Sequence, residues 1–235
     1  MAFTASDVKR LREQTGCGMM DCKKALTEAD GDFDKAVDYL REKGLAAATK
    51  KAGRIAAEGM VSVVIRGNAG VIIEVNSETD FVAKNDQFRN FVELCANVVI
   101  DQRPADVEAL LACKVGEKTV EEELREQILT IGENIKIRRF EYQEGNLVSY
   151  IHGGGTVAVL VNFDTDAATA AKPEFETYGK DVAMQIAAMN PLYLNKESVP
   201  AADIEKEKEI QIAQMQNDPK MANKPTNVLE KIVMG

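Results

Sequence analysis

Few side chains in this sequence are placed to act together in catalysis or to hold a metal ion. The single histidine, His152, could serve as a base, but neither a nucleophile nor a second titratable partner stands near it. The three glycines after it lack the Lys-Ser/Thr that follows in a phosphate-binding loop. The four cysteines, at positions 17, 22, 95 and 113, form no CxxC pair. We therefore expect reduced thiols, a hydrogen-bonding or packing role for His152, and no catalytic residue, metal or cofactor.

Apolar side chains in polar turns indicate a different chemistry, contact with another molecule. In the stretch VNSETDFVAKND, at positions 75–86, Asp80 stands beside Phe81. The ring of Phe81 either tucks under a neighbouring helix or is offered to a partner, where burying it would be worth about 1.5–3 kcal/mol. Met19 and Met20, in GCGMMD, pose the same choice between the core of a small bundle, the commoner fate, and an adaptable contact surface. Adjacent residues at a helix start cannot both face inward, so we expect at least one exposed methionine.

The composition limits the class of protein. The chain has 235 residues, 45% of them hydrophobic and 29% charged, as in a globular protein. No apolar run approaches the roughly 20 residues of a membrane span, and the N-terminus has no secretory apolar segment. The net charge of -9 disfavours nucleic acid as the main partner. Residues 1–56 contain eleven Lys/Arg and nine Asp/Glu, a net of +2, so a mildly basic head on an acidic body favours a protein partner.

The head is predicted to form three short helices. Thr4 and Asp7 resemble a capping box for the first helix. The two glycines of TGCGMMD interrupt the helical pattern, which resumes from Asp21 to Ala29. Asp32 can cap a third helix that we expect to end at Gly44, followed by an Ala-rich helical linker.

The body contains an internal repeat of a hairpin, a turn and a helix. The β-rich runs around positions 67–70 and 153–155 predict two hairpins. VNSETD at 75–80 recurs as VNFDTD at 161–166, so that Asp80 corresponds to Asp166 and Phe81 to Ala167. The pairs Phe88/Phe175, Phe91/Tyr178 and Ala96/Ala183 recur at an offset larger by one. We expect the Thr-Asp pair to hold the turn by local hydrogen bonds, while the scaffold does not require an aromatic residue after it.

The repeat also predicts a third strand for each copy, because a bare hairpin is marginal in water. NIKIRRFEY, at 134–142, supplies it in the first copy, with a slip of phase that indicates a bulge. Nothing strand-like follows residue 163 in the second copy, which we expect to lack its last strand. The fold class is α+β, with a helical head and linker at 1–56, core halves at 57–145 and 146–198, and an incomplete helical arm at 199–235.

The motifs TGCGMMDCKKALTEADGD, KKAG, TDFVAKND, IGENI and SYIHGG closely resemble those of the bacterial elongation factor Ts family. The likeness runs from about residue 4 to the end of the chain. It implies a ubiquitin-associated-like three-helix head, two similar α+β halves and a coiled-coil arm. It also implies a cytoplasmic translation factor that promotes release of GDP from elongation factor Tu, binding the GDP-bound and nucleotide-free forms without bond-making chemistry of its own.

The resemblance further implies which residues contact the partner. Asp80 and Phe81 match residues that intrude beside the partner's nucleotide and magnesium site. The other matching positions are Arg12, Met19 and Met20 in the head, the basic Lys23 and Lys51, Ile131 and Gly132 in the first half, and His152 in the second half. Two alternatives remain open: a ubiquitin-associated-type adaptor without exchange activity, and a small enzyme that uses His152.

Overall fold

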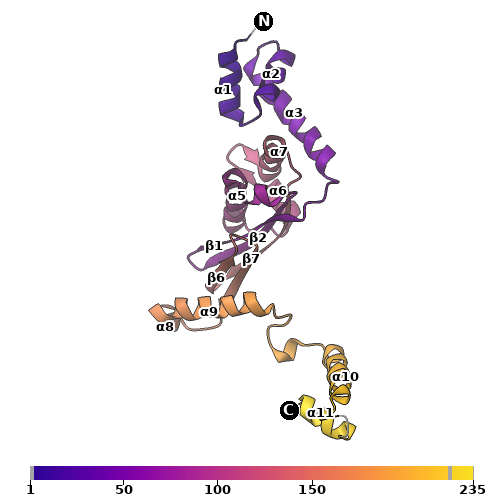
Figure 1. The fold of residues 1–235 in the computed structure, drawn as a ribbon. Helices are drawn as coiled ribbons and strands as arrows, with labels where there is room; N and C mark the ends of the chain where they lie inside the picture. Colours follow the sequence, from indigo (N-terminus) through magenta and orange to yellow (C-terminus); the bar gives the residue numbers. More distant parts are fainter. Residues whose placement is uncertain (1–2, 222–223, 235) are drawn as a thin grey trace. The chain divides into compact units, whose positions relative to one another are not determined.

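A computed structural model describes residues 3–221 and 224–234 of the chain, which forms two compact units, Met1–Ala188 and Met189–Gly235 (Figure 1). Helices and strands occur in the first unit and helices in the described part of the second. The predicted α+β class is therefore confirmed. The four-part division predicted above stays a prediction.

The head consists of α1 (Ala5–Thr15), α2 (Met19–Glu28) and α3 (Phe33–Lys51). The capping box at Thr4 and Asp7 is present, and Asp32 accepts a hydrogen bond from the main-chain N–H of Lys35, so both predicted caps are confirmed. Apolar residues at helical spacing fill a small core that includes Leu11, Leu26 and other side chains from all three helices. This core holds the three helices together.

Two predictions for the head are wrong. The third helix does not end at Gly44 but continues without interruption to Lys51. Gly44 is buried at the crossing of α3 and α7 (Val120–Ile131), where a Cβ would lie 3.5 Å from the carbonyl oxygen of Arg125. Packing against α7 therefore offsets the low helix propensity of glycine. The second helix begins at Met19 rather than at Asp21, with Gly18 in the N-cap position.

The first core half is a three-stranded antiparallel sheet with helices on one face. Its strands are β1 (Glu58–Arg66), β2 (Ala69–Ser77) and β5 (Lys136–Glu144), in the order β1-β2-β5. The alternate side chains Val71, Ile73 and Val75 of β2 pack with α5 (Asp86–Gln102) in the main core. The predicted bulge is confirmed, because the register between β2 and β5 shifts after Glu74. The strand starts two residues later than predicted.

Several short elements of this half were not predicted. They are α4 (Asp80–Ala83), α6 (Val107–Ala112) and the two-residue strands β3 (Lys114–Val115) and β4 (Lys118–Thr119). Figure 1 shows α5, α6 and α7 gathered beside the β1–β2 hairpin. The start of α7 has its own capping box at Thr119 and Glu122, and α7 ends at Ile131 with Gly132 in the left-handed conformation.

The second core half repeats the first with one strand fewer. It contains β6 (Asn146–His152), β7 (Val157–Phe163), α8 (Ala167–Ala170) and α9 (Pro173–Met189). In the described residues β6 and β7 form a two-stranded sheet, which agrees with the prediction that this copy lacks a third strand. The hairpin lies on the sheet face opposite α5, where a Cβ at Gly70 would stand 2.6 Å from the side chain of Leu147, so a larger residue at position 70 would force Leu147 to move.

Equivalent hydrogen bonds confirm the repeat. The side-chain amide of Asn76 donates to the carbonyl oxygen of Glu58, and that of Asn162 donates to the carbonyl oxygen of Glu144. The long helices α5 and α9 both have 17 residues. The two copies of the unit therefore share the hairpin and the long helix and differ in the third strand, which the first copy alone has among the described residues.

One detail of the repeat was predicted wrongly. Thr79 is the N-cap of α4, whereas Asp166 is the N-cap of α8, so the two aspartates do not play the same role. The extra residue of the second copy lies before the cap, which places Asp80 opposite Ala167 and Phe81 opposite Ala168. The second copy still has no aromatic residue at this position.

The second unit contains a short 3-10 helix, η1 (Lys196–Ser198), and two longer helices, α10 (Ala201–Asn217) and α11 (Thr226–Met234). Both predicted helices are present and pack against each other, with Leu229 of α11 fully buried. Positions 222–223 of the predicted loop and Gly235 lie outside the described residues. Within the described part of the chain, no helix combines the length and apolar character that crossing a membrane requires.

Candidate functional site

Phe81 stands out of the protein surface on the four-residue helix α4. Its side chain is 80% exposed, whereas that of the next residue, Val82, is buried in the main core. Thr79 caps the helix by accepting a hydrogen bond from the N–H of Val82. Of the two alternatives for Phe81, burial under a neighbouring helix is wrong and exposure is confirmed.

Asp80 precedes Phe81 as the first residue of α4 and does not cap it. Its carboxylate accepts a hydrogen bond of 2.6 Å from the ammonium group of Lys84, one helical turn later. This hydrogen bond and the positive charge of Lys84 lower the pKa of Asp80. Of the Thr-Asp pair predicted to hold the turn, Thr79 does so as the cap of α4, whereas Asp80 does not. The carboxylate of Asp80 is a charged group at the surface beside the exposed ring.

The turn before α4 is tied to the end of α7 by reciprocal hydrogen bonds. The Glu133 carboxylate accepts from the N–H groups of Glu78 and Thr79, both at 3.0 Å, and from the hydroxyl of Thr79 at 2.7 Å. In return, Glu78 accepts from the N–H of Asn134 at 2.6 Å. The segment 131–134 and the segment 78–81, far apart in sequence, are thereby fixed to each other. Ile131 and Gly132 thus lie next to the turn that carries Phe81.

Lys51 is part of the same assembly. Its ammonium group donates to the carbonyl oxygen of Ile128 at 3.2 Å, in the last turn of α7, where a positive charge is favourable. Burial lowers the pKa of Lys51 and the neighbouring Arg54 lowers it further, while Glu78 and Glu133 act in the opposite direction. The side chain of Lys51 therefore has an internal role at the junction of head and body.

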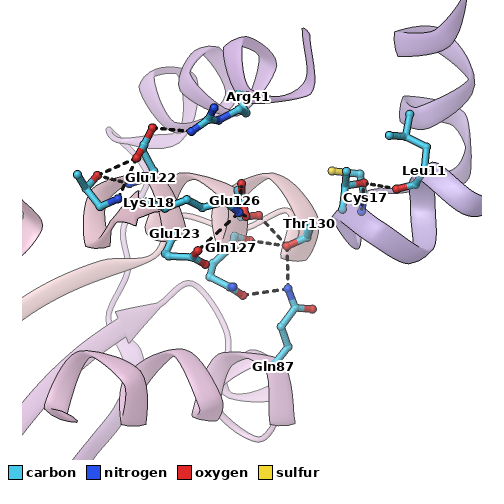
Figure 2. Close-up of polar contacts among 12 residues, drawn as sticks. Leu11, Cys17, Arg41, Gln87, Lys118, Glu122, Glu123, Glu126, Gln127 and Thr130 are labelled. Atoms are coloured by element: carbon cyan, nitrogen blue, oxygen red, sulfur yellow. Dashed lines mark hydrogen bonds and ion pairs between the residues drawn. The ribbon is translucent and has the colours of Figure 1, made fainter. Parts of the chain in front are cut away.

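The head contacts α7 along much of its length, and Figure 2 shows the polar pair that Arg41 forms with Glu122. Arg41 of α3 bonds Glu122 at 2.8 Å near the start of α7. At the other end, a Cβ at Gly16 would lie 3.7 Å from Thr130, whose hydroxyl also accepts a hydrogen bond from Gln87 at the start of α5. The last turn of α7 is thus where the head, the first half and the Phe81 turn meet.

Four predicted contact residues lie on the surface of the head. Arg12 and Lys23 are exposed, and the side chains of Met19 and Met20 are 46% and 74% exposed. Filling the bundle core is therefore wrong for both methionines, because helix α2 starts early enough to place them in its first turn. No hydrogen bond in residues 3–221 and 224–234 joins these four side chains to the Phe81 turn.

His152 ends β6 at the entrance to the Gly-rich turn. Its Nδ1 lies 2.9 Å from the hydroxyl of Tyr150, which agrees with the hydrogen-bonding role expected for it. Arg89 of α5 connects this turn with the Phe81 helix: its Nε donates to the carbonyl oxygen of Ala83 at 3.3 Å, and a Cβ at Gly154 would lie 3.8 Å from its Nη2. The second half therefore approaches the same site from another side.

The electrostatics of the cysteines disfavour nucleophilic chemistry. Burial raises the pKa of Cys17 and of Cys22, and it raises the pKa of Cys95 to about 12. The thiolate is the reactive form of cysteine, so these thiols are poor nucleophiles. No group of three or more His, Cys, Asp or Glu side chains in the part of the chain that is described could hold a metal ion. The arrangement is suited to contact with another macromolecule.

Sequence reasoning missed three residues of this site. Glu133 stands in the IGENI motif, from which only Ile131 and Gly132 were expected to contact a partner, and Arg89 gives no signal in the sequence. Ile55 is a large apolar residue that is 85% exposed and follows Arg54, whose carbonyl oxygen accepts a hydrogen bond from Asn134.

Known proteins similar to this chain agree with one another. The family model described as "Elongation factor TS" matches residues 78–235. An elongation factor Ts of Trichlorobacter lovleyi is 50% identical over 244 residues, which cover 100% of this chain and 77% of the relative. Proteins of the same name from Clostridium perfringens and Syntrophotalea carbinolica are 51% and 49% identical, each with 77% of its length covered. The chain belongs to the elongation factor Ts family of translation elongation factors.

Proposed function

We propose that this protein is a guanine nucleotide exchange factor that binds elongation factor Tu in its GDP-bound form and promotes release of GDP. It would act in the cytoplasm by binding alone, forming no covalent bond with partner or nucleotide. Family membership supports the partner, and the exposed ring of Phe81 on a firmly held turn supports the mode of action.

The driving force would be coupled binding. A factor that binds the nucleotide-free partner more tightly than the GDP-bound partner must weaken GDP binding by the same ratio. Phe81 would enter an apolar gap of the partner and displace the segment that positions its magnesium ligands. Without the ion, the charge of the GDP phosphates loses its compensation and the nucleotide dissociates faster. Asp80 would compete electrostatically at that site.

The other predicted contact residues would supply affinity. Arg12, Met19, Met20 and Lys23 lie on the surface of the head, which we propose is ubiquitin-associated-like and binds the partner's nucleotide domain. Ile131, Gly132 and His152 would flank the Phe81 turn on the partner's surface. Lys51 would act chiefly by holding the head against α7, since its ammonium group already has a partner there. The helical pair α10 and α11 would form part of a coiled-coil arm.

The observation that carries the proposal is the 80% exposure of Phe81 beside a buried Val82. The test is to mix the protein with elongation factor Tu that carries labelled GDP and to follow the loss of label. We expect catalytic amounts of the protein to accelerate release. Binding without acceleration would favour the adaptor alternative and would contradict the proposed exchange activity.

A further inference from the structure

We propose that Glu133 is the positioning residue of the exchange site: its carboxylate holds Thr79 and thereby fixes the direction in which Phe81 projects. The inference rests on the proposed function and assigns a role to a residue that contacts neither nucleotide nor partner in the mechanism above. It starts from the three hydrogen bonds that Glu133 accepts from the 78–79 segment.

The position of Phe81 requires support from outside α4. A helix of four residues is far shorter than any that is stable alone in water, since nucleating a helix is costly. Phe81 itself provides no support, because its ring is exposed. The anchors include the buried side chain of Val82, the hydrogen bond that the carbonyl oxygen of Ala83 accepts from Arg89, and the cap at Thr79.

Glu133 determines how Thr79 acts as a cap. The hydroxyl of Thr79 donates its only proton to Glu133 Oε1 at 2.7 Å. A lone pair of the same oxygen is then free to accept from the N–H of Val82 at 3.5 Å. Hydrogen bonds to an ionised acceptor are shorter and stronger than neutral ones, so the carboxylate dominates this arrangement. Glu133 is thus connected through the hydroxyl group of Thr79 to the first turn of α4.

Glu133 also has two further bonds to the main chain of the same turn. Its second oxygen accepts from the N–H groups of both Glu78 and Thr79, so one side chain binds three donors within two residues. Glu133 follows Gly132, whose φ of 89° ends α7 and turns the chain toward α4. The rigid helix α7 is therefore the support on which the exchange turn is mounted.

Neighbouring charges make this carboxylate suitable for the role. The positive charge of Arg54 lowers the pKa of Lys51, and the negative charges of Glu78 and Glu133 raise it, so these four side chains lie close to one another. Arg54 pairs with Glu78 at 3.3 Å. Two acidic and two basic side chains thus balance around the junction.

The test compares four variants of the full chain in the labelled-GDP assay. We expect Glu133→Ala to lower the maximal rate of GDP release by about tenfold, the effect of losing one strong interaction of the acting conformation. Thr79→Val should lower it similarly, whereas Thr79→Ser, which keeps the hydroxyl, should stay within about twofold of the unmodified protein. Glu108→Ala is the matched control, since the side chain of Glu108 forms no hydrogen bond or ion pair among the described residues.

A double variant separates positioning from general loss of structure. If Glu133 acts through Phe81, Glu133→Ala should slow release no further in a chain that already carries Phe81→Ala. Hydrogen exchange of the amides in 79–84 should become faster in Glu133→Ala, while that of the β1 and β2 amides should not change. An unchanged maximal rate in Glu133→Ala, or an additive effect in the double variant, would overturn the positioning role. If Phe81→Ala itself leaves release unchanged, the proposed function fails instead.

Discussion

Replacing Gly44 by alanine should stabilise the protein, because the residue occupies a helix interior and not a helix end. Gly44 lies within the 19 residues of α3, at the crossing with α7. A Cβ there would stand 3.5 Å from the carbonyl oxygen of Arg125 and 3.8 Å from the side chain of Leu129, which are ordinary contact distances. The added methyl group therefore fits without moving either helix.

The expected gain follows from two contributions. Alanine is more favourable than glycine in a helix interior by about 0.8–1 kcal/mol. Burying one methyl group adds at most about 0.8 kcal/mol, reduced here by the tightness of the contact. We expect a net gain of about 1 kcal/mol in the free energy of unfolding, which for a chain of this size corresponds to a Tm higher by about 2–4 °C.

The assay is thermal unfolding followed by circular dichroism, with Gly16→Ala as the matched control. Gly16 also contacts α7, but its φ of 67° is strained for alanine, so the same substitution should destabilise by about 1 kcal/mol. Opposite shifts in the two variants would support the α3–α7 contact. A lower Tm for Gly44→Ala would show that the two helices approach more closely than described and would refute the reasoning.

Two further predictions concern the head and the sheet. Combining Met19→Ala with Met20→Ala should raise the concentration of this protein that gives half-maximal GDP release by about tenfold. The maximal rate and the Tm should stay nearly unchanged, because both side chains are exposed and supply affinity only. A lower maximal rate would contradict this role. Burial alone would raise the pKa of Glu74, but hydrogen bonds from Arg139 and Asn76 lower it overall. A lowered pKa stabilises the fold above the unfolded value of about 4.3 and loses that effect as the pH falls through the folded value. Urea unfolding should therefore show Glu74→Gln to be less stable by about 1 kcal/mol at pH 7, with a smaller difference at pH 3; an equal difference at both values would contradict the assignment.

Much of the fold could be predicted because its signals are local. The glycines at the hairpin turns, the caps at Thr4 and Asp32 and the phase slip before Phe140 each act over a few residues. The internal repeat added the expectation of two similar halves, the second without a third strand, which agrees with the two-stranded sheet of the described residues. Elements of two to six residues, such as β3, β4 and α6, were missed because they are too short to show a period.

The errors arose where tertiary contacts decide. Gly44 has the composition of a helix end, and only the packing of α3 on α7 continues the helix through it. Phe81 is exposed because its neighbour Val82 faces the core. From the sequence alone, either of these two adjacent apolar residues could be the buried one. Glu133 binds a segment 54–55 positions away in the chain, and no sequence pattern connects the two. The sequence therefore predicted which residues belong to the candidate site, but it did not predict that Glu133 holds the turn that carries Phe81.

The central claim is that the exposed ring of Phe81 drives release of GDP from the partner. The most direct measurement is the rate of labelled-GDP loss from elongation factor Tu with the unmodified protein, with Phe81→Ala and with Leu194→Ala, which removes an apolar side chain that is 95% exposed in the second unit. We predict that Phe81→Ala lowers the maximal rate by about tenfold or more, as losing 1.5–3 kcal/mol of ring burial implies, with its Tm unchanged. Leu194→Ala should retain the full rate. Equal rates for the folded Phe81→Ala variant and the unmodified protein would contradict the claim.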